Sequence, residues 1–247
     1  MSKRNYPLVY AHRGACGYAP ENTMASFRKA MEQGADGFEL DVQMTKDGEV
    51  VVVHDEYLER VSDGKGFVKD YTLEQLRKMN FNRQFPEYGF QQIPTLKEVL
   101  DLLKPTALGL NIELKTNVFH YDGIVDKVFA LVEESGMKDR IIYSSFNHET
   151  CVEIRNRQKD AYVGFLYADG FLDVEEYVKN HGGNALHPAF YLLQDMRSVR
   201  KARQLGLDIN AWVINEPEHL EMACQRKLNI IITNYPDRAL NIVKKYK

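Results

Sequence analysis

The chain alternates between short β-rich runs and segments of helical periodicity, and this alternation limits the folds available to it. Most of the β-rich runs are separated by stretches with apolar residues at helical spacing, such as 22–34, 121–136 and 195–206. Nine such runs occur, at 7–13, 37–43, 49–55, 108–115, 140–146, 161–167, 184–190, 207–215 and 229–236. Repeated alternation of strand and helix favours a parallel sheet, and about eight repeats favour a closed (βα)8 barrel of the TIM type, in the α/β class.

One connection departs from this pattern. Only a few residues separate the second and third runs, whereas a parallel crossover needs a dozen or more. We therefore predict an antiparallel hairpin here. Asp47-Gly48 is a favoured two-residue turn, which would place Asp41 opposite His54, and a three-residue loop would shift this register by one. With either loop, we expect His54 to lie beside the strand face that carries Glu39 and Asp41.

The length of 247 residues is typical of one large barrel domain, so we predict a single domain over 1–247. The stretch at about 56–105 is less regular than the rest and is predicted to be a small insertion after the strand carrying His54. Its glycines and aromatic residues could form a cap over the mouth of the site. Alternatively, the insertion only covers the edges of the barrel.

Composition narrows the classes of partner and compartment. The formal net charge of −3 argues against a nucleic-acid-binding face, because such faces are strongly basic. No apolar stretch reaches the length of a signal peptide or a membrane span, so we expect a cytoplasmic protein without stable membrane association. The three cysteines are far apart and lack CxxC spacing, so they are expected to be free thiols. Whether the chain forms a homodimer is left open.

Acidic side chains recur at a spacing of two on predicted strands. Glu39 and Asp41 lie on one run, and Glu113 and Lys115 lie on another. Because alternate residues of a strand share a face, each pair points the same way. A salt-bridged strand face would explain these residues, but buried carboxylates are costly unless paired or metal-bound, which favours a metal site. A set of carboxylate oxygens suits Mg²⁺ or Ca²⁺ better than zinc.

Two histidines lie near these carboxylates in the expected barrel. His12 and Arg13 open the motif HRGACGYAPENT, and His54 follows a run of four valines. A lone histidine is often a core residue whose ring is satisfied by the backbone. Here the histidines join three carboxylates and two cationic side chains around one centre. Imidazole groups titrate near neutral pH, so this set suits metal-assisted cleavage of a phosphodiester.

The ordered set of motifs resembles the glycerophosphodiester phosphodiesterase family over essentially the whole chain. The matching pieces are HRG with PENT, ELDVQMTKDG, VVHD, NIELK, SSF, HP, WVIN and IITNYPD, in the order of the family. The resemblance implies a (βα)8 barrel with a small insertion after the strand that carries the second histidine. It also implies one divalent cation as cofactor and a small-molecule glycerophosphodiester as substrate.

The resemblance further assigns roles to individual positions. The residues that match the family's metal ligands are Glu39, Asp41 and Glu113. The residues that match its catalytic pair are His12 and His54. The residues that match its phosphate and glycerol contacts are Arg13, Lys115 and Trp212. Lys115 could instead be a structural ion-pair partner of Glu113, and Trp212 could be a packing residue.

The expected reaction is metal-dependent hydrolysis of glycerophosphodiesters to sn-glycerol 3-phosphate and an alcohol, with His12 as base and His54 as acid. Attack by water and attack by a neighbouring glycerol hydroxyl, which gives a cyclic phosphate, both remain open. One alternative is a phospholipase-like enzyme that acts on intact lipid, which the lack of an apolar or polybasic run disfavours. Another is a non-catalytic polyol-phosphate binding protein, in which either histidine could be lost without effect.

Overall fold

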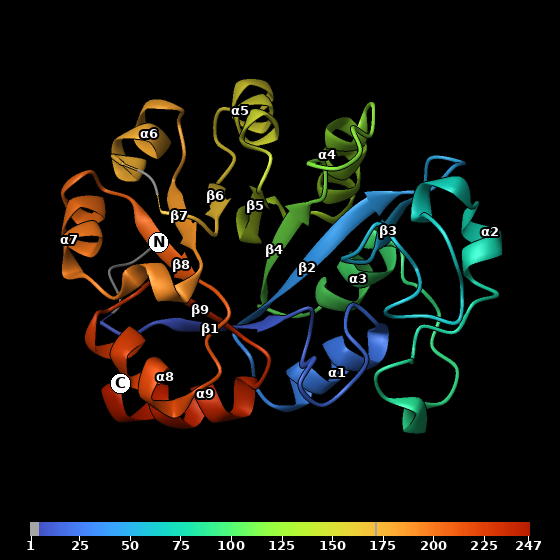
Figure 1. Cartoon of the computed structure of the whole chain (residues 1–247), viewed down its shortest axis with the longest axis horizontal. Helices are drawn as coiled ribbons and strands as arrows, with labels where there is room; N and C mark the ends of the chain where they lie inside the picture. Colours follow the sequence, from blue (N-terminus) through green and yellow to red (C-terminus); the bar gives the residue numbers. More distant parts are fainter. Residues whose placement is uncertain (1–4, 171) are drawn as a thin grey trace.

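The computed structural model describes residues 5–170 and 172–247, and within them eight parallel strands close into a barrel (Figure 1). The strand order is β1-β9-β8-β7-β6-β5-β4-β2, and β2 pairs back to β1. The barrel strands are β1 Leu8–His12, β2 Gly37–Met44, β4 Gly109–Leu114, β5 Ile141–Ser145, β6 Val163–Tyr167, β7 Ala185–Pro188, β8 Asp208–Ala211 and β9 Ile230–Thr233. An extra strand, β3 (Val50–Val52), pairs with the end of β2. The predicted (βα)8 TIM-type barrel is confirmed.

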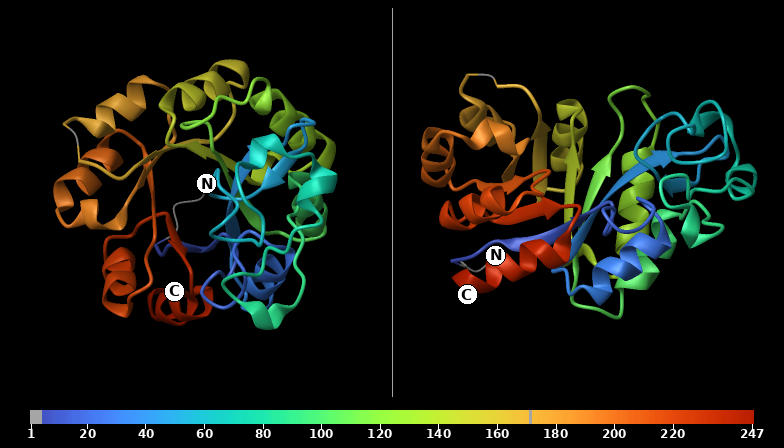
Figure 2. Two further views of the ribbon diagram at one scale, coloured as in Figure 1. Left: turned by 45° about the vertical axis from the view of Figure 1, so that its right-hand side comes forward. Right: turned by 60° about the horizontal axis from the view of Figure 1, so that its bottom comes forward.

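Helices follow the strands and surround the barrel (Figure 2). They are α1 Met24–Glu32, α2 Leu73–Leu76, α3 Leu96–Leu103, α4 Ile124–Ser135, α5 His148–Arg157, α6 Val174–Asn180, α7 Met196–Gln204, α8 Pro217–Gln225 and α9 Pro236–Val243. Short 3₁₀ turns cover η1 Val68–Asp70, η2 Pro86–Tyr88, η3 Lys138–Arg140, η4 Phe190–Leu193 and η5 Lys244–Tyr246. Within the described residues, no helix combines the length and the apolar character that crossing a membrane requires.

Local sequence signals explain where the helices begin and end. At the start of α3, the Thr95 hydroxyl accepts from the N–H of Glu98 at 3.2 Å, and the Glu98 carboxylate accepts from the N–H of Thr95 at 2.8 Å. This reciprocal capping satisfies two backbone donors that the helix leaves unpaired. Gly136 ends α4 in the left-handed conformation, with φ of 71°. The buried face of α3 packs on the barrel through Leu96, Val99, Leu100 and Leu103.

The hairpin between β2 and β3 has a three-residue loop over 46–48. Thr45 is the last paired residue of the first strand, because its N–H donates to the carbonyl of Glu49 at 3.0 Å. Gly48 takes φ of 83°, the left-handed conformation that such a loop needs at its last position. Val53, rather than His54, therefore lies opposite Asp41. The two-residue register predicted from Asp47-Gly48 is wrong, and the shift by one is the correct alternative.

The segment after β3 builds a small core on the outer side of that strand. Val51 and Val53 alternate with Val50 and Val52, so one pair faces the small core while the other faces the barrel core. The small core contains Val51, Val53, Leu58, Val61, Val68, Leu76, Phe81 and Ile93. Figure 1 shows its helix α2 beside β3, at one side of the barrel. Beyond Ile93, α3 packs on the barrel core.

A layer of polar side chains lies inside the barrel, below the strand ends. The Asn210 amide donates to His187 Nε2 at 2.9 Å, and the Ser144 hydroxyl donates to Asn111 Oδ1 at 3.0 Å. Gly164 makes room for the imidazole, since a Cβ there would lie 2.1 Å from His187 Nε2. His187 is therefore fully buried in the interior of the barrel.

Acidification is expected to destabilise the fold through His187. Burial lowers the pKa of His187 to about 3, whereas an unfolded histidine titrates near its ordinary value of about 6.5. Between these values the unfolded chain binds one more proton at this position. His187 should therefore contribute a fall of about 1.4 kcal/mol per pH unit to the free energy of unfolding as the pH drops below about 6.

Urea unfolding at a series of pH values measures this dependence. His187→Gln should show a slope that is shallower by that amount. Equal slopes for wild type and His187→Gln would contradict the prediction.

Candidate active site

Three buried carboxylates meet at the carboxyl ends of β2 and β4. Glu39 and Asp41 alternate along β2, and the strand register places Asp41 directly opposite Glu113 of β4. Their exposed fractions are 4%, 0% and 6%, respectively. One oxygen of each carboxylate lies within 4.8 Å of the others, a spacing that allows all three to share one ion. The face predicted from the two-residue spacing therefore points into the barrel mouth.

The electrostatics of this cluster favour a bound cation. Burial, with the charges of Asp41 and Glu113, raises the pKa of Glu39 well above its ordinary value, and burial beside Asp41 raises the pKa of Glu113. Burial would also raise the pKa of Asp41, but its interactions with His54, Arg13 and Lys115 outweigh burial and lower this pKa. Asp41 Oδ1 is buried and accepts no hydrogen bond from the described residues. Hard oxygen donors with unrelieved repulsion fit a divalent cation.

The carboxyl end of β1 places His12 beside the carboxylates, and the strand register sets it opposite Glu39. Its Nδ1 lies 2.7 Å from the side-chain oxygen of Asn234, which follows the neighbouring strand β9. Because an amide oxygen only accepts, Nδ1 carries the proton and Nε2 is left as an acceptor. Nε2 lies 4.0 Å from Glu39 Oε2. Burial and the neighbouring Arg13 charge lower the pKa of His12 to about 3, which keeps the ring neutral.

Arg13 reaches three acidic side chains from a tight turn. Its backbone N–H donates to Glu39 Oε2 at 3.0 Å, and its guanidinium Nη1 donates to Glu21 Oε1 at 2.9 Å. Its Nε lies 3.3 Å from Asp41 Oδ2. The turn depends on Gly14, at φ of 78°, where a Cβ would lie 2.4 Å from the Ser26 hydroxyl. The HRG motif thus lets the loop pack against α1 while Arg13 faces the mouth of the barrel.

His54 and Lys115 lie on the other side of the carboxylates. Lys115 Nζ donates to Glu113 Oε1 at 3.0 Å and lies 3.2 Å from His54 Nε2. An ammonium group only donates, so His54 Nε2 accepts and the ring proton is on Nδ1. Nδ1 faces Asp55 Oδ1 at 2.5 Å. Lys115 is therefore the ion-pair partner of Glu113 and also a cation at the edge of the pocket.

These residues surround a cavity with about 340 Å³ of empty volume, lined by His12, Arg13, Glu39, His54, Asn111, Glu113, Phe146, Leu166, Trp212 and Ile232. Trp212 contributes one wall, where its ring meets that of Phe146 edge to face at 5.4 Å, and its Nε1 donates to the carbonyl of His187 at 2.8 Å. None of these lining residues comes from the segment 56–105. The predicted site residues are thus brought together, with Asp41 and Lys115 just behind the lining.

Several contacts in the site have no counterpart in the prediction. Asn22 donates to Asp41 Oδ2 at 2.8 Å, Asn234 holds His12, and Asp55 holds His54. The PENT, VVHD and IITNYPD motifs contain these residues, so the signal lay next to the assigned positions. Cys16, which lies in the first motif, has its pKa raised to about 12 by burial and is therefore a neutral thiol.

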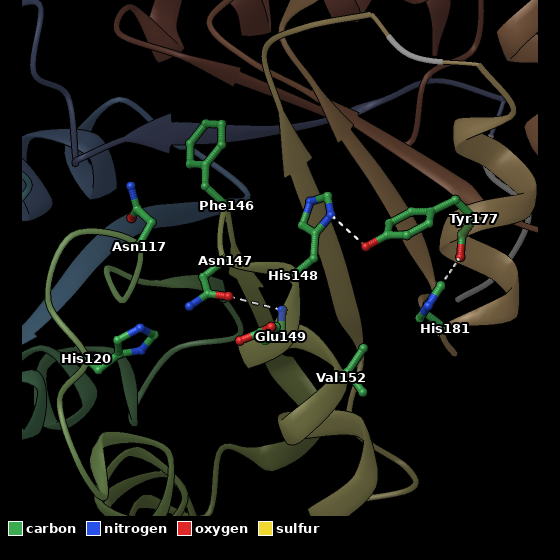
Figure 3. Close-up of a pocket in the computed structure, with 9 residues that line it drawn as sticks. All are labelled: Asn117, His120, Phe146, Asn147, His148, Glu149, Val152, Tyr177 and His181. Atoms are coloured by element: carbon green, nitrogen blue, oxygen red, sulfur yellow. Dashed lines mark hydrogen bonds between the residues drawn. The ribbon is translucent and has the colours of Figure 1, made fainter.

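A second, more open hollow of about 1120 Å³ adjoins the first (Figure 3), and Phe146 lines both. His148 points toward Tyr177 there; its Nε2 donates to the Leu166 carbonyl at 2.8 Å, so Nδ1 accepts from the Tyr177 hydroxyl at 3.2 Å. The lining also includes His120 and His181. Over residues 5–170 and 172–247, however, only the three carboxylates of the first pocket approach closely enough to share a metal ion.

Comparisons with known proteins agree with this geometry. The chain is 38% identical to a glycerophosphodiester phosphodiesterase of Caldanaerobacter subterraneus subsp. tengcongensis, over 96% of this chain and 98% of that protein. It is 35% identical to a glycerophosphodiester phosphodiesterase of Bacillus altitudinis, over 97% of this chain and 99% of that protein.

Solved structures show the same architecture. The phosphodiesterase of Oleispira antarctica in complex with the product sn-glycerol-3-phosphate has a TM-score of 0.85 and 28% identity, with 97% of each chain covered. The glycerophosphodiester phosphodiesterase of Thermotoga maritima has a TM-score of 0.78 and 28% identity, over 96% of this chain and 98% of that one. Residues 12–238 match the model of the glycerophosphoryl diester phosphodiesterase family. The chain therefore belongs to the glycerophosphodiester phosphodiesterase family, and the resemblance and enzyme class predicted from its motifs are confirmed.

Proposed function

We propose that this chain hydrolyses glycerophosphodiesters to sn-glycerol 3-phosphate and an alcohol, using one divalent cation, Mg²⁺ or Ca²⁺, and two histidines. The observation that carries the proposal is the cluster of three buried carboxylates within 4.8 Å, flanked by His12 and His54 in one pocket. The solved relative that contains sn-glycerol-3-phosphate supports this choice of product.

The phosphate needs its charge neutralised before a nucleophile can approach. A divalent cation held by Glu39, Asp41 and Glu113 would supply Lewis-acid activation of a phosphoryl oxygen. Arg13 offers a planar fork, with its Nε 3.3 Å from Asp41 Oδ2, and Lys115 offers a point charge, with its Nζ 3.0 Å from Glu113 Oε1. We assign these two side chains to the phosphate and Trp212 to the glycerol portion.

The two histidines divide the proton transfers. His12 is neutral with its proton held on Nδ1 by Asn234, so its Nε2 can take the proton of the attacking oxygen. His54 has the carboxylate of Asp55 behind its Nδ1, the arrangement that supports a ring carrying a second proton. We therefore assign His12 as base and His54 as acid toward the leaving alcohol. Water and the neighbouring glycerol hydroxyl both remain possible nucleophiles.

Chelation followed by add-back tests the proposed function. Hydrolysis of glycerophosphocholine should be abolished by excess chelator and restored by Mg²⁺ or Ca²⁺ added in turn, because the buried carboxylates repel one another and the phosphate without a cation. Released sn-glycerol 3-phosphate and choline are measured directly. Undiminished activity in excess chelator would remove the metal from the proposal, and release of phosphatidic acid and choline from phosphatidylcholine vesicles would support the lipid-active alternative.

A further inference from the structure

Arg60 joins two loops that carry site residues. It lies in the segment after β3, and its guanidinium contacts two carboxylates at once. Arg60 Nη1 and Nη2 donate to the two oxygens of Glu21 at 2.7 and 2.8 Å. Its Nε and Nη2 donate to the two oxygens of Asp55, the latter at 3.0 Å. The planar guanidinium of Arg60 therefore donates a pair of hydrogen bonds to each of the two loops.

Each of these carboxylates in turn holds a residue of the pocket. Asp55 Oδ1 lies 2.5 Å from His54 Nδ1, and Glu21 Oε1 accepts from Arg13 Nη1 at 2.9 Å. A continuous chain of contacts thus runs from His54 to Arg13 through Arg60. Both ends of this chain line the pocket, whereas Arg60 does not.

The pKa values of Glu21 and Asp55 depend on Arg60. Burial alone would raise the pKa of Glu21, but hydrogen bonds from Arg60 and the charge of Arg13 lower it. In the same way, burial alone would raise the pKa of Asp55, but the contacts with His54 and Arg60 lower it. Without Arg60, the ionised carboxylates of Glu21 and Asp55 would lie close together, and each would lose one of its hydrogen-bond partners. The side chains of His54 and Arg13 would then lose a fixed anchor.

We propose that Arg60 is a positioning residue for the hydrolysis, whose guanidinium clamps Asp55 and Glu21 together and thereby fixes His54 and Arg13 on opposite sides of the phosphate. The insertion thus serves the reaction without lining the pocket. A lysine could not replace this arginine, because a point charge cannot satisfy two carboxylates with paired hydrogen bonds. The kinetic part of this inference rests on the proposed function.

The insertion has other attachments, so removing Arg60 should leave it folded in place. Its small core includes Val51 of β3 and Val53, which directly follows that strand. The Tyr88 hydroxyl also donates to the carbonyl of Tyr18 at 2.9 Å, which ties the insertion to the first loop independently. Arg60 itself is 39% exposed, so its truncation creates no core cavity.

The experiment compares Arg60→Ala and Arg60→Lys with a matched control, Arg77→Ala. Arg77 also pairs with a carboxylate, Glu98 at 2.6 Å, and is 35% exposed, but it has no contact with the pocket. We measure kcat and KM for glycerophosphocholine, with and without millimolar guanidinium. We also record the ring signals of His54 by NMR with nitrogen-labelled histidine, assigned with His54→Gln.

We expect both Arg60 variants to lose about 10- to 100-fold in kcat, because an imidazole displaced by an ångström transfers protons poorly. Guanidinium should restore part of the loss in Arg60→Ala only, and the His54 ring signals should shift in both Arg60 variants. Arg77→Ala should match wild type in every measurement. If Arg60→Ala proves unstable, Arg60→Lys is compared with wild type instead, because it keeps the positive charge and the aliphatic part of the side chain.

Two results would overturn the inference: a wild-type kcat in the Arg60 variants, or a loss that guanidinium does not restore and that leaves the His54 signals unmoved. Absence of hydrolysis by the wild type with every cation would instead defeat the proposed function. In that case the His54 signals still decide whether Arg60 holds the ring.

Discussion

Replacing any one of the three buried carboxylates by its amide should lower kcat/KM by about 10³-fold or more. An amide keeps the shape of the side chain but removes its charge, so the site for the cation loses one of three anionic ligands. Charge stabilisation by a bound metal contributes several kcal/mol, and each 1.4 kcal/mol corresponds to a factor of ten in rate. The variants are Glu39→Gln, Asp41→Asn and Glu113→Gln.

The structure also predicts the opposite effect of these variants on stability without metal. Burial and mutual repulsion raise the pKa of Glu39 and Glu113, so removing one charge relieves the others. The metal-free Glu39→Gln and Glu113→Gln variants should therefore unfold at a temperature equal to or above that of the metal-free wild type. Mg²⁺ or Ca²⁺ should raise the melting temperature of the wild type by mass action and leave the variants unchanged.

Activity and melting curves with and without each cation measure both effects. Glu218→Gln, which removes an exposed carboxylate on α8, is the control and should behave as wild type. A variant of the cluster with wild-type turnover and an unchanged response to metal would show that these carboxylates form a structural ion-pair network instead.

Replacing either histidine of the pocket by alanine should lower kcat by about 10²–10⁴-fold while leaving the fold intact, because each ring carries one proton transfer. His219→Ala is the control, because that ring packs against Phe190 with centroids 4.8 Å apart and lines neither pocket. Near-normal turnover in both His12→Ala and His54→Ala would refute the acid–base pair.

A change of leaving group separates the two roles. Glycerophospho-p-nitrophenol releases a phenolate that needs little protonation, so the loss in His54→Ala should shrink with this substrate. The loss in His12→Ala should persist, because the attacking oxygen still has to give up its proton. If His12→Ala is the variant that recovers instead, the assignment of base and acid is reversed.

The hairpin and the network around Arg60 show where local sequence signals stop being sufficient. The Asp47-Gly48 pair indicated a turn at the right place, but two loop lengths suit this pair. Asp47 also accepts from the N–H of Leu73 at 3.0 Å, a contact that depends on the folded insertion. Similarly, nothing near Arg60 in the sequence points to Glu21, which lies 39 positions away.

The sequence by itself determined the barrel and the face on which its acids lie. Strand and helix periodicities are local, so alternation along the chain predicts the architecture, and a spacing of two places Glu39 and Asp41 on one side of a strand. Only the tertiary structure decided which side chains meet. The register that sets Asp41 opposite Glu113, and the closure that brings Asn234 to His12 across 222 positions, depend on the packing of all strands together. Such non-local contacts arise from the whole barrel, because no single segment encodes the position of its distant partners.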